Sequence, residues 1–117
     1  ASTRFNEADL FYGHGSDNAW DDAAQLLSFA LNLPLDAADI LDARLTMAER
    51  QKVVQLIHER ISTRKPVPYL THRAWFAGIE FYVDERVLVP RSPIAELIQN
   101  HFEPWLADSP KNILDLC

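Results

Sequence analysis

The stretch at 65–96 constrains the fold more than any other, because it holds the chain's densest run of aromatic and β-branched residues. Two runs of alternating character, R-A-W-F-A at 73–77 and I-E-F-Y-V at 79–83, lie on either side of Gly78. Glycine suits a turn because it has no Cβ to restrict the backbone. The pattern predicts a β-hairpin that turns at Gly78 and joins two helical parts.

A third extended run, V-L-V at 87–89, follows the hairpin and is ended by Pro90. Ser92 followed by Pro93 is typical of a helix start, with serine as the cap and proline in the first turn. We therefore expect a helix at 93–103, whose apolar face holds Ile94, Leu97, Ile98, Phe102 and Trp105. After a loop, Ile113 to Cys117 has the pattern of a buried strand.

Two longer amphipathic helices are predicted before the hairpin, at 19–32 and 46–63, with a short helix at 35–45 between them. The first is capped at Asp17-Asn18. Its apolar residues recur at three- and four-residue spacing, at Trp20, Ala23, Ala24, Leu27, Ala30 and Leu31, and Leu26 and Phe29 widen this face. The second opens with a capping box, Thr46 to Glu49, and its inner face is expected to hold Met47, Val54, Ile57 and Ile61, with Val53 beside them. Residues 1–15 are weakly patterned, and Gly13-His14-Gly15 predicts a turn.

The composition is that of one small folded domain, with 117 residues, 48% apolar residues and a net charge of −6. The acidic balance argues against a broad nucleic-acid-binding surface. A single cysteine excludes an internal disulfide and favours a reducing compartment, which predicts a cytoplasmic protein. No apolar run approaches the roughly 20 residues of a membrane helix. Both ends look cut, so we expect a fragment of a longer protein.

Two charge clusters have alternative interpretations. Arg60, Arg64 and Lys65 at the end of the second long helix either complement the helix dipole or form a basic patch toward RNA or a nascent protein. The acidic cluster is either a solvated surface or a negative face for a basic partner. Its members are Asp17, Asp21, Asp22, Asp36, Asp39 and Asp42.

The residues show no catalytic constellation. The four histidines at 14, 58, 72 and 101 form no metal-binding pair, and a second cysteine is absent. There is no phosphate-binding loop or nucleophile elbow. Asp84 and Glu85 are interpreted as turn residues and Cys117 as a strand residue.

The stretch at 68–96 nevertheless resembles a known family. Its motifs are P-Y-L-T, then W-F-x-G-x-x-F-Y-V, then V-L-V-P-R-S-P-I-x-E-L-I. They are similar to the hairpin linker of the protein glutamine N5-methyltransferases. Ser92, Pro93 and Ile94 after Arg91 favour the branch that methylates a glutamine of ribosomal protein three of the large subunit. The release-factor branch usually has P-R-x-x-T-E at this place.

The resemblance implies a mainly α fold: an amino-terminal helical substrate-recognition domain at 1–64, a β-hairpin linker at 65–90, and at 91–117 the first helix and strand of a Rossmann-like methyltransferase domain. The family's S-adenosylmethionine loop and its Asn-Pro-Pro-Tyr motif come later in the chain, so no catalytic residue is expected here and the fragment alone should be inactive. The resemblance implies that Pro90, Arg91 and Asp115 lie near the cofactor, because Asp115 ends the first strand and the other two precede the adjacent helix. A structural salt bridge from Arg91 to Glu96 or Asp115 is the alternative. Two other functions stay open: a nucleic-acid adenine methyltransferase, which shares the Asn-Pro-Pro-Tyr motif, and a non-enzymatic helical interaction module.

Overall fold

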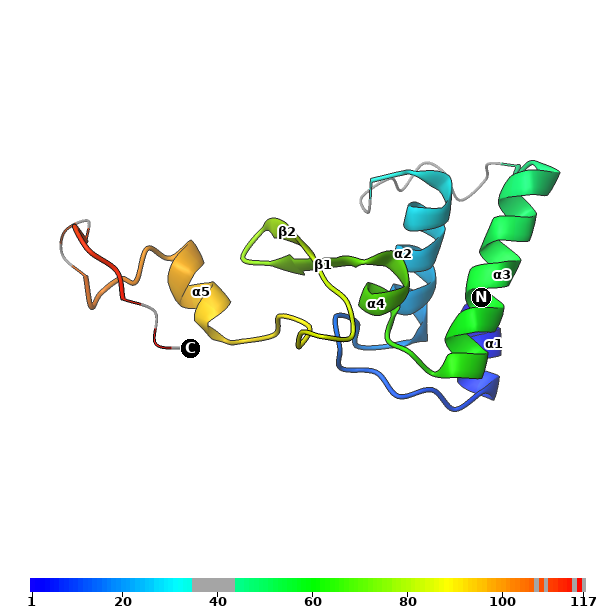
Figure 1. The fold of residues 1–117 in the computed structure, drawn as a ribbon, viewed down its shortest axis with the longest axis horizontal. Coiled ribbons are helices and arrows are strands. Elements are labelled where there is room, and N and C mark those ends of the chain that lie inside the picture. Colours follow the sequence, from blue (N-terminus) through cyan, green and yellow to red (C-terminus); the bar gives the residue numbers. More distant parts are fainter. Residues whose placement is uncertain (35–43, 107, 109, 115, 117) are drawn as a thin grey trace.

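The computed structural model describes residues 1–34, 44–106, 108, 110–114 and 116. Within these residues it contains five helices and one two-stranded antiparallel sheet, which confirms a helix-rich fold (Figure 1). The elements are α1 (Ser2–Glu7), α2 (Ala19–Leu31), α3 (Met47–Thr63), α4 (Val67–Thr71), β1 (Arg73–Phe76), β2 (Ile79–Tyr82) and α5 (Ile94–Gln99). The predicted helix at 35–45 lies largely outside the described residues. None of the described helices is long and apolar enough to span a bilayer.

The two long helices, α2 and α3, lie side by side and antiparallel, and both have the ends that the sequence predicts (Figure 1). The Asn18 side chain caps α2 by accepting hydrogen bonds from the backbone N–H groups of Trp20 and Asp21, at 2.9 and 3.0 Å. Thr46 and Glu49 form the predicted capping box at the start of α3. Each cap satisfies backbone donors that the first turn leaves free, which fixes where the helix begins.

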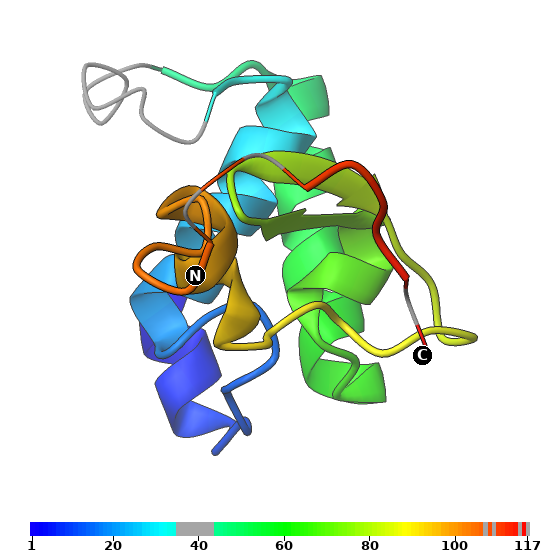
Figure 2. The ribbon, with the colours of Figure 1, turned by 90° about the vertical axis from the view of Figure 1, so that its left-hand side faces the viewer.

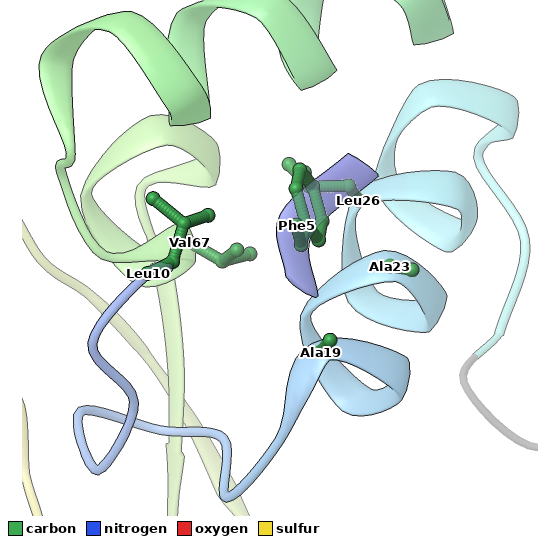
Figure 3. Packing of buried hydrophobic residues seen from close by; sticks show 6 residues of the cluster. All are labelled: Phe5, Leu10, Ala19, Ala23, Leu26 and Val67. Atoms are coloured by element: carbon green, nitrogen blue, oxygen red, sulfur yellow. The ribbon is translucent and has the colours of Figure 1, made fainter. Parts of the chain in front are cut away.

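The main core lies between α1, α2, α3 and α4. Figure 3 shows its buried members, and Leu56, Ile57 and Ile61 of α3 pack against them. These buried members are Phe5, Leu10, Ala19, Ala23, Leu26 and Val67. A second, smaller cluster of Ala74, Val83 and Val89 lies beneath the hairpin, with Tyr69 packed against it.

The inward faces of α2 and α3 differ from those predicted. Trp20 on α2, and Met47 and Val54 on α3, were expected in the core but are exposed. Ala23, Leu26 and Ala30 of the predicted α2 face are buried, and Ile57 and Ile61 of the predicted α3 face pack against the core. Each helix also buries a charged residue that the apolar pattern excluded, Asp22 on α2 and Arg60 on α3.

Two short helices surround this core, and the sequence indicated neither clearly. The α1 helix places Phe5 in the core, although the sequence of residues 1–15 is only weakly patterned. The α4 helix occupies part of the predicted linker and begins with Pro68 in its first turn. Proline is tolerated there because the first-turn N–H groups have no partner within the helix.

The hairpin has the predicted position and turn. β1 pairs with β2 in the register Arg73↔Tyr82, Ala74↔Phe81, Trp75↔Glu80 and Phe76↔Ile79. Ala77 and Gly78 connect the strands, and both have positive φ angles, of 49° and 80°. A two-residue connection with positive φ at both positions matches the right-handed twist of the strands, so the turn fixes the register.

The segment after the hairpin extends away from the helices (Figure 1), and in the view along the long axis it lies in front of them (Figure 2). The radius of gyration is 17.2 Å, whereas about 13 Å is usual for a compact domain of some 100 residues. The α5 helix is shorter than predicted and has no buried residue, and its N-cap is Pro93 rather than Ser92. Trp105, expected on its apolar face, is exposed.

The predicted final strand is not seen at its described residues. Ile113, Leu114 and Leu116 are exposed and belong to no strand, while Asp115 and Cys117 lie outside the described residues. A lone strand has no neighbour for its backbone hydrogen bonds, so it does not form by itself. The Rossmann-like part of the fold stays a prediction.

Candidate functional site

A groove of about 590 Å³ lies between the carboxyl end of α2 and the hairpin. Alternation along β1 places Arg73 and Trp75 on one face of the hairpin, and Glu80 joins them because it is the register partner of Trp75. The α2 side of the groove contributes Gln25, Ser28, Phe29 and Asn32. The groove therefore combines aromatic rings, one ion pair and uncharged polar side chains.

The charged groups of this groove are arranged around Phe29 and Glu80. Arg73 Nε lies 3.1 Å from Glu80 Oε1, and its guanidinium carbon is 5.8 Å from the centroid of the Phe29 ring. Lys52 Nζ approaches the same ring at 5.5 Å. The pair of Arg73 and Glu80 is about half exposed, so it contributes at most about 1 kcal/mol to stability and rearranges easily when a partner binds.

The Trp75 side chain is the largest apolar surface of the groove and is 53% exposed. An exposed tryptophan beside a carboxylate offers a flat face for apolar or cationic side chains and an acceptor for their polar ends. Among the described residues that line the groove, Arg73 and Glu80 are the charged ones, and they are paired with each other.

A buried ion pair joins Asp22 of α2 to Arg60 of α3. Arg60 Nε donates to Asp22 Oδ2 at 2.8 Å, and the Arg60 and Asp22 side chains are 2% and 1% exposed. Ser16 Oγ donates to the other oxygen of Asp22. Arg60 also donates from its two terminal nitrogens to the carbonyl oxygens of Phe11 and Arg64, each at 3.0 Å. The pair thus connects α2, α3 and the segment that precedes α2.

Tyr12 lies beside this pair, with the Arg60 guanidinium 6.0 Å from the centroid of its ring. Burial and the nearby negative charge of Asp22 raise the pKa of the Tyr12 hydroxyl above its usual value. The hydroxyl is buried and has no hydrogen-bond partner among the described residues. The tyrosine is therefore neutral at physiological pH and serves as a packing residue.

The basic patch predicted at the end of α3 is wrong for Arg60, which is buried. Arg64 is exposed but donates to the carbonyl oxygens of Ala8 and Asp9, and Lys65 pairs with Glu85. Arg60 is therefore not part of a surface patch, and a role of Arg64 and Lys65 toward RNA or a nascent protein stays a prediction.

The predicted acidic face is likewise reduced by the structure. Asp22 points into the interior and cannot contact a partner. Asp17 is exposed and Asp21 is half-buried, near the start of α2. Asp36, Asp39 and Asp42 lie outside the described residues, so their share of a negative face stays a prediction.

The carboxylates after the hairpin are turn residues. Hydrogen bonds from the Arg86 side chain and backbone lower the pKa of Asp84 to about 2. Asp84 therefore stays ionised near neutral pH, which does not suit a general acid. In the part of the chain that the structure describes, no three histidine, cysteine, aspartate or glutamate side chains gather to hold a metal ion.

Two of the three predicted cofactor-proximal residues can be placed. Pro90 is half-buried, and Arg91 is exposed and donates from Nη1 to the carbonyl oxygen of Gly13 at 3.4 Å. Asp115 lies outside the described residues. A role of Pro90, Arg91 and Asp115 beside a cofactor stays a prediction.

Comparison with known proteins adds what the geometry alone does not show. The chain is 51% identical, over 120 aligned positions, to proteins from Neisseria meningitidis serogroup A and serogroup B that are both named ribosomal protein uL3 glutamine methyltransferase. The resemblance to the glutamine methyltransferases is confirmed. The alignment includes the whole chain but only 40% of each relative. A comparison with sequence models of protein families found no match.

The similarity to the uL3 glutamine methyltransferases covers both the helical part and the hairpin, so it includes every element that forms the groove. Sequence reasoning missed the groove and the pair of Asp22 and Arg60. The alternation of β1 could have placed Arg73 beside Trp75. Nothing local could have indicated that Phe29 would lie opposite them.

Proposed function

We propose that this chain is the amino-terminal substrate-recognition part of an S-adenosylmethionine-dependent methyltransferase that methylates the side-chain amide of a glutamine in ribosomal protein uL3. The supporting observation is the 51% identity across the entire chain to proteins of that name. Because the chain spans 40% of the length of those relatives, the activity, the cofactor and the substrate are proposed for the whole protein.

The proposed division of labour follows from what these residues contain. Residues 1–64 form the helical recognition domain, 65–90 the linker and 91–117 the start of the catalytic domain. The chain has three glycines, at 13, 15 and 78, and therefore no Gly-rich cofactor loop. S-adenosylmethionine supplies the methyl group when it binds to the whole enzyme, and Pro90, Arg91 and Asp115 are proposed to lie near it.

The exposed apolar side chains after Gly78 support this division. Several large apolar residues of the hairpin, α5 and the carboxyl-terminal segment have exposed surfaces: Ile79, Phe81, Val87, Leu88, Ile94, Ile98, Ile113, Leu114 and Leu116. Monomeric proteins rarely expose so much apolar surface unless another surface covers it. We propose that the catalytic domain packs on this segment, while the groove on the α2 side of the hairpin receives the ribosomal protein.

The function is tested by incubating the full-length enzyme with labelled S-adenosylmethionine and each of three substrates: purified uL3, a peptide-chain release factor and DNA. We expect label in uL3 alone, and peptide fragmentation should place one methyl group on a glutamine side chain. The 117-residue chain by itself should transfer no label. Label on adenine in DNA, with none in uL3, would contradict this proposal and favour the function of a nucleic-acid adenine methyltransferase.

The groove is tested in the full-length enzyme with Trp75→Ala. We expect the KM for uL3 to rise about tenfold with little change in kcat, because loss of the tryptophan removes about 1–2 kcal/mol of substrate binding away from the reacting amide. Trp20→Ala is the matched control, since Trp20 is 62% exposed on α2 but does not line the groove. Equal KM values for the two variants would show that uL3 binds elsewhere.

A further inference from the structure

The loop from Gly13 to Ser16 lies where the helical part meets the segment that leaves the hairpin. On the helical side, Gly13 N donates to Ser16 O at 2.8 Å, and Gln25 Nε2 of α2 donates to Gly15 O at 2.7 Å. Ser16 is tied to the buried Asp22. The loop is therefore held firmly to α2.

The opposite side of the same loop contacts residues that follow α3. A Cβ added to Gly15 would lie 2.8 Å from Pro68 Cγ and 3.7 Å from Val89 Cγ1. Both Pro68 and Val89 are fully buried, so neither side chain can turn outward to make room. Two residues after Val89, the Arg91 side chain donates to the carbonyl oxygen of Gly13.

These contacts determine the direction in which the chain continues after residue 91. The α5 helix has no buried residue, so its own packing does not fix its place relative to α2 and α3. Val89 is the last fully buried residue before α5 among those described, and it is held between the hairpin cluster and Gly15. The position of the chain after residue 91 thus depends on the contacts of Val89 and Arg91 with this loop.

We propose that the Gly13–Ser16 loop is the joint that sets the orientation of the helical part relative to the chain beyond Arg91, and that Gly15 is a positioning residue for the methylation of uL3. This inference rests on the function proposed above. A substrate protein held by the helical part presents its glutamine to the catalytic domain in the right orientation only when the contacts of this loop are intact. A displacement of about 1 Å far from the reacting atoms can lower a rate about a hundredfold.

The test compares Gly15→Ala with Gly13→Ala in the full-length enzyme. Gly13 and Gly15 have similar positive φ angles, 103° and 96°, so the backbone strain of an added Cβ is nearly the same in both variants. A Cβ at Gly13 meets nothing within 4 Å, whereas at Gly15 it collides with Pro68. We expect Gly15→Ala to lower kcat for uL3 about ten- to a hundredfold relative to Gly13→Ala, with the KM nearly unchanged.

Two further measurements separate orientation from loss of folded enzyme. A short peptide that contains the methylated glutamine does not need the helical part, so its rate should be the same for both variants. Adding Pro68→Ala to Gly15→Ala removes the colliding Cγ atom and should restore most of the rate on uL3. Equal methylation rates of the two glycine variants on uL3 would contradict the proposed role of the loop. So would a loss of rate on the peptide that parallels the loss on uL3. A wild-type enzyme that does not methylate uL3 would instead overturn the proposed function.

Discussion

Asp22→Asn should lower the free energy of unfolding by about 3–5 kcal/mol, because it leaves the charge of Arg60 buried without its partner. Asparagine has nearly the same shape as aspartate, so the change removes the charge and one strong acceptor but leaves little cavity. Arg60 and Asp22 are 2% and 1% exposed, and water cannot replace the lost carboxylate. Urea unfolding followed by circular dichroism measures the effect.

Asp21→Asn is the control for this change. Asp21 is the neighbouring residue in the same first turn, but it is only half-buried, and its carboxylate accepts a hydrogen bond from the Asn18 side chain. Its replacement should change the free energy of unfolding by no more than about 1 kcal/mol. Similar losses for the two variants would show that the pair is not buried as described.

A double variant separates the charge effect from general damage. Replacing both partners by apolar residues, with Asp22→Leu and Arg60→Met, should recover most of the stability that Asp22→Asn loses, since no buried charge is then left unpaired. A double variant that is less stable than Asp22→Asn would mean that the hydrogen bonds to Phe11, Arg64 and Ser16, rather than the charge, dominate.

The features that sequence reasoning predicted are those with local causes. The cap at Asn18, the capping box at Thr46 and the turn at Gly78 each depend on residues within a few positions of one another. A short stretch of sequence is therefore enough to recognise each of them. These caps and this turn determine where α2, α3 and the hairpin begin or end.

The features that it missed depend on contacts far apart in the chain. Asp22 and Arg60 are 38 positions apart, and each alone is typical of a solvated surface. Only their pairing makes both acceptable in the interior, so each helix buries a charged residue that its apolar pattern does not indicate. Trp20 and Val54, in contrast, are apolar residues that remain exposed.

The short helices show a different limit. Six residues in α1 are too few to show a helical period, so the apolar Phe5 alone did not indicate a helix. Pro68 falls in the stretch predicted as the β-hairpin linker, whereas the structure uses it in the first turn of a helix. Proline is common both in extended segments and in the first turn of a helix. Here the packing of the neighbouring Val67 in the core favours the helix.

Phe5→Ala should lower the free energy of unfolding by about 3–5 kcal/mol, because it removes a fully buried aromatic ring and leaves a cavity. The Phe5 side chain is 0% exposed and lies with Leu26 of α2 in the main core (Figure 3). The expected loss is a large part of the roughly 5–15 kcal/mol that stabilises a small domain. It would establish α1 as an integral part of the helical domain rather than a frayed end.

Phe11→Ala is the matched control, because it removes the same ring from the same amino-terminal segment. The Phe11 side chain is 76% exposed, and the residue contributes to the interior through its backbone carbonyl oxygen, which accepts a hydrogen bond from Arg60. The substitution leaves that carbonyl in place and should change the free energy of unfolding by less than about 0.5 kcal/mol. If the two phenylalanine variants unfold at the same urea concentration, α1 does not pack on α2, and the core is formed without α1.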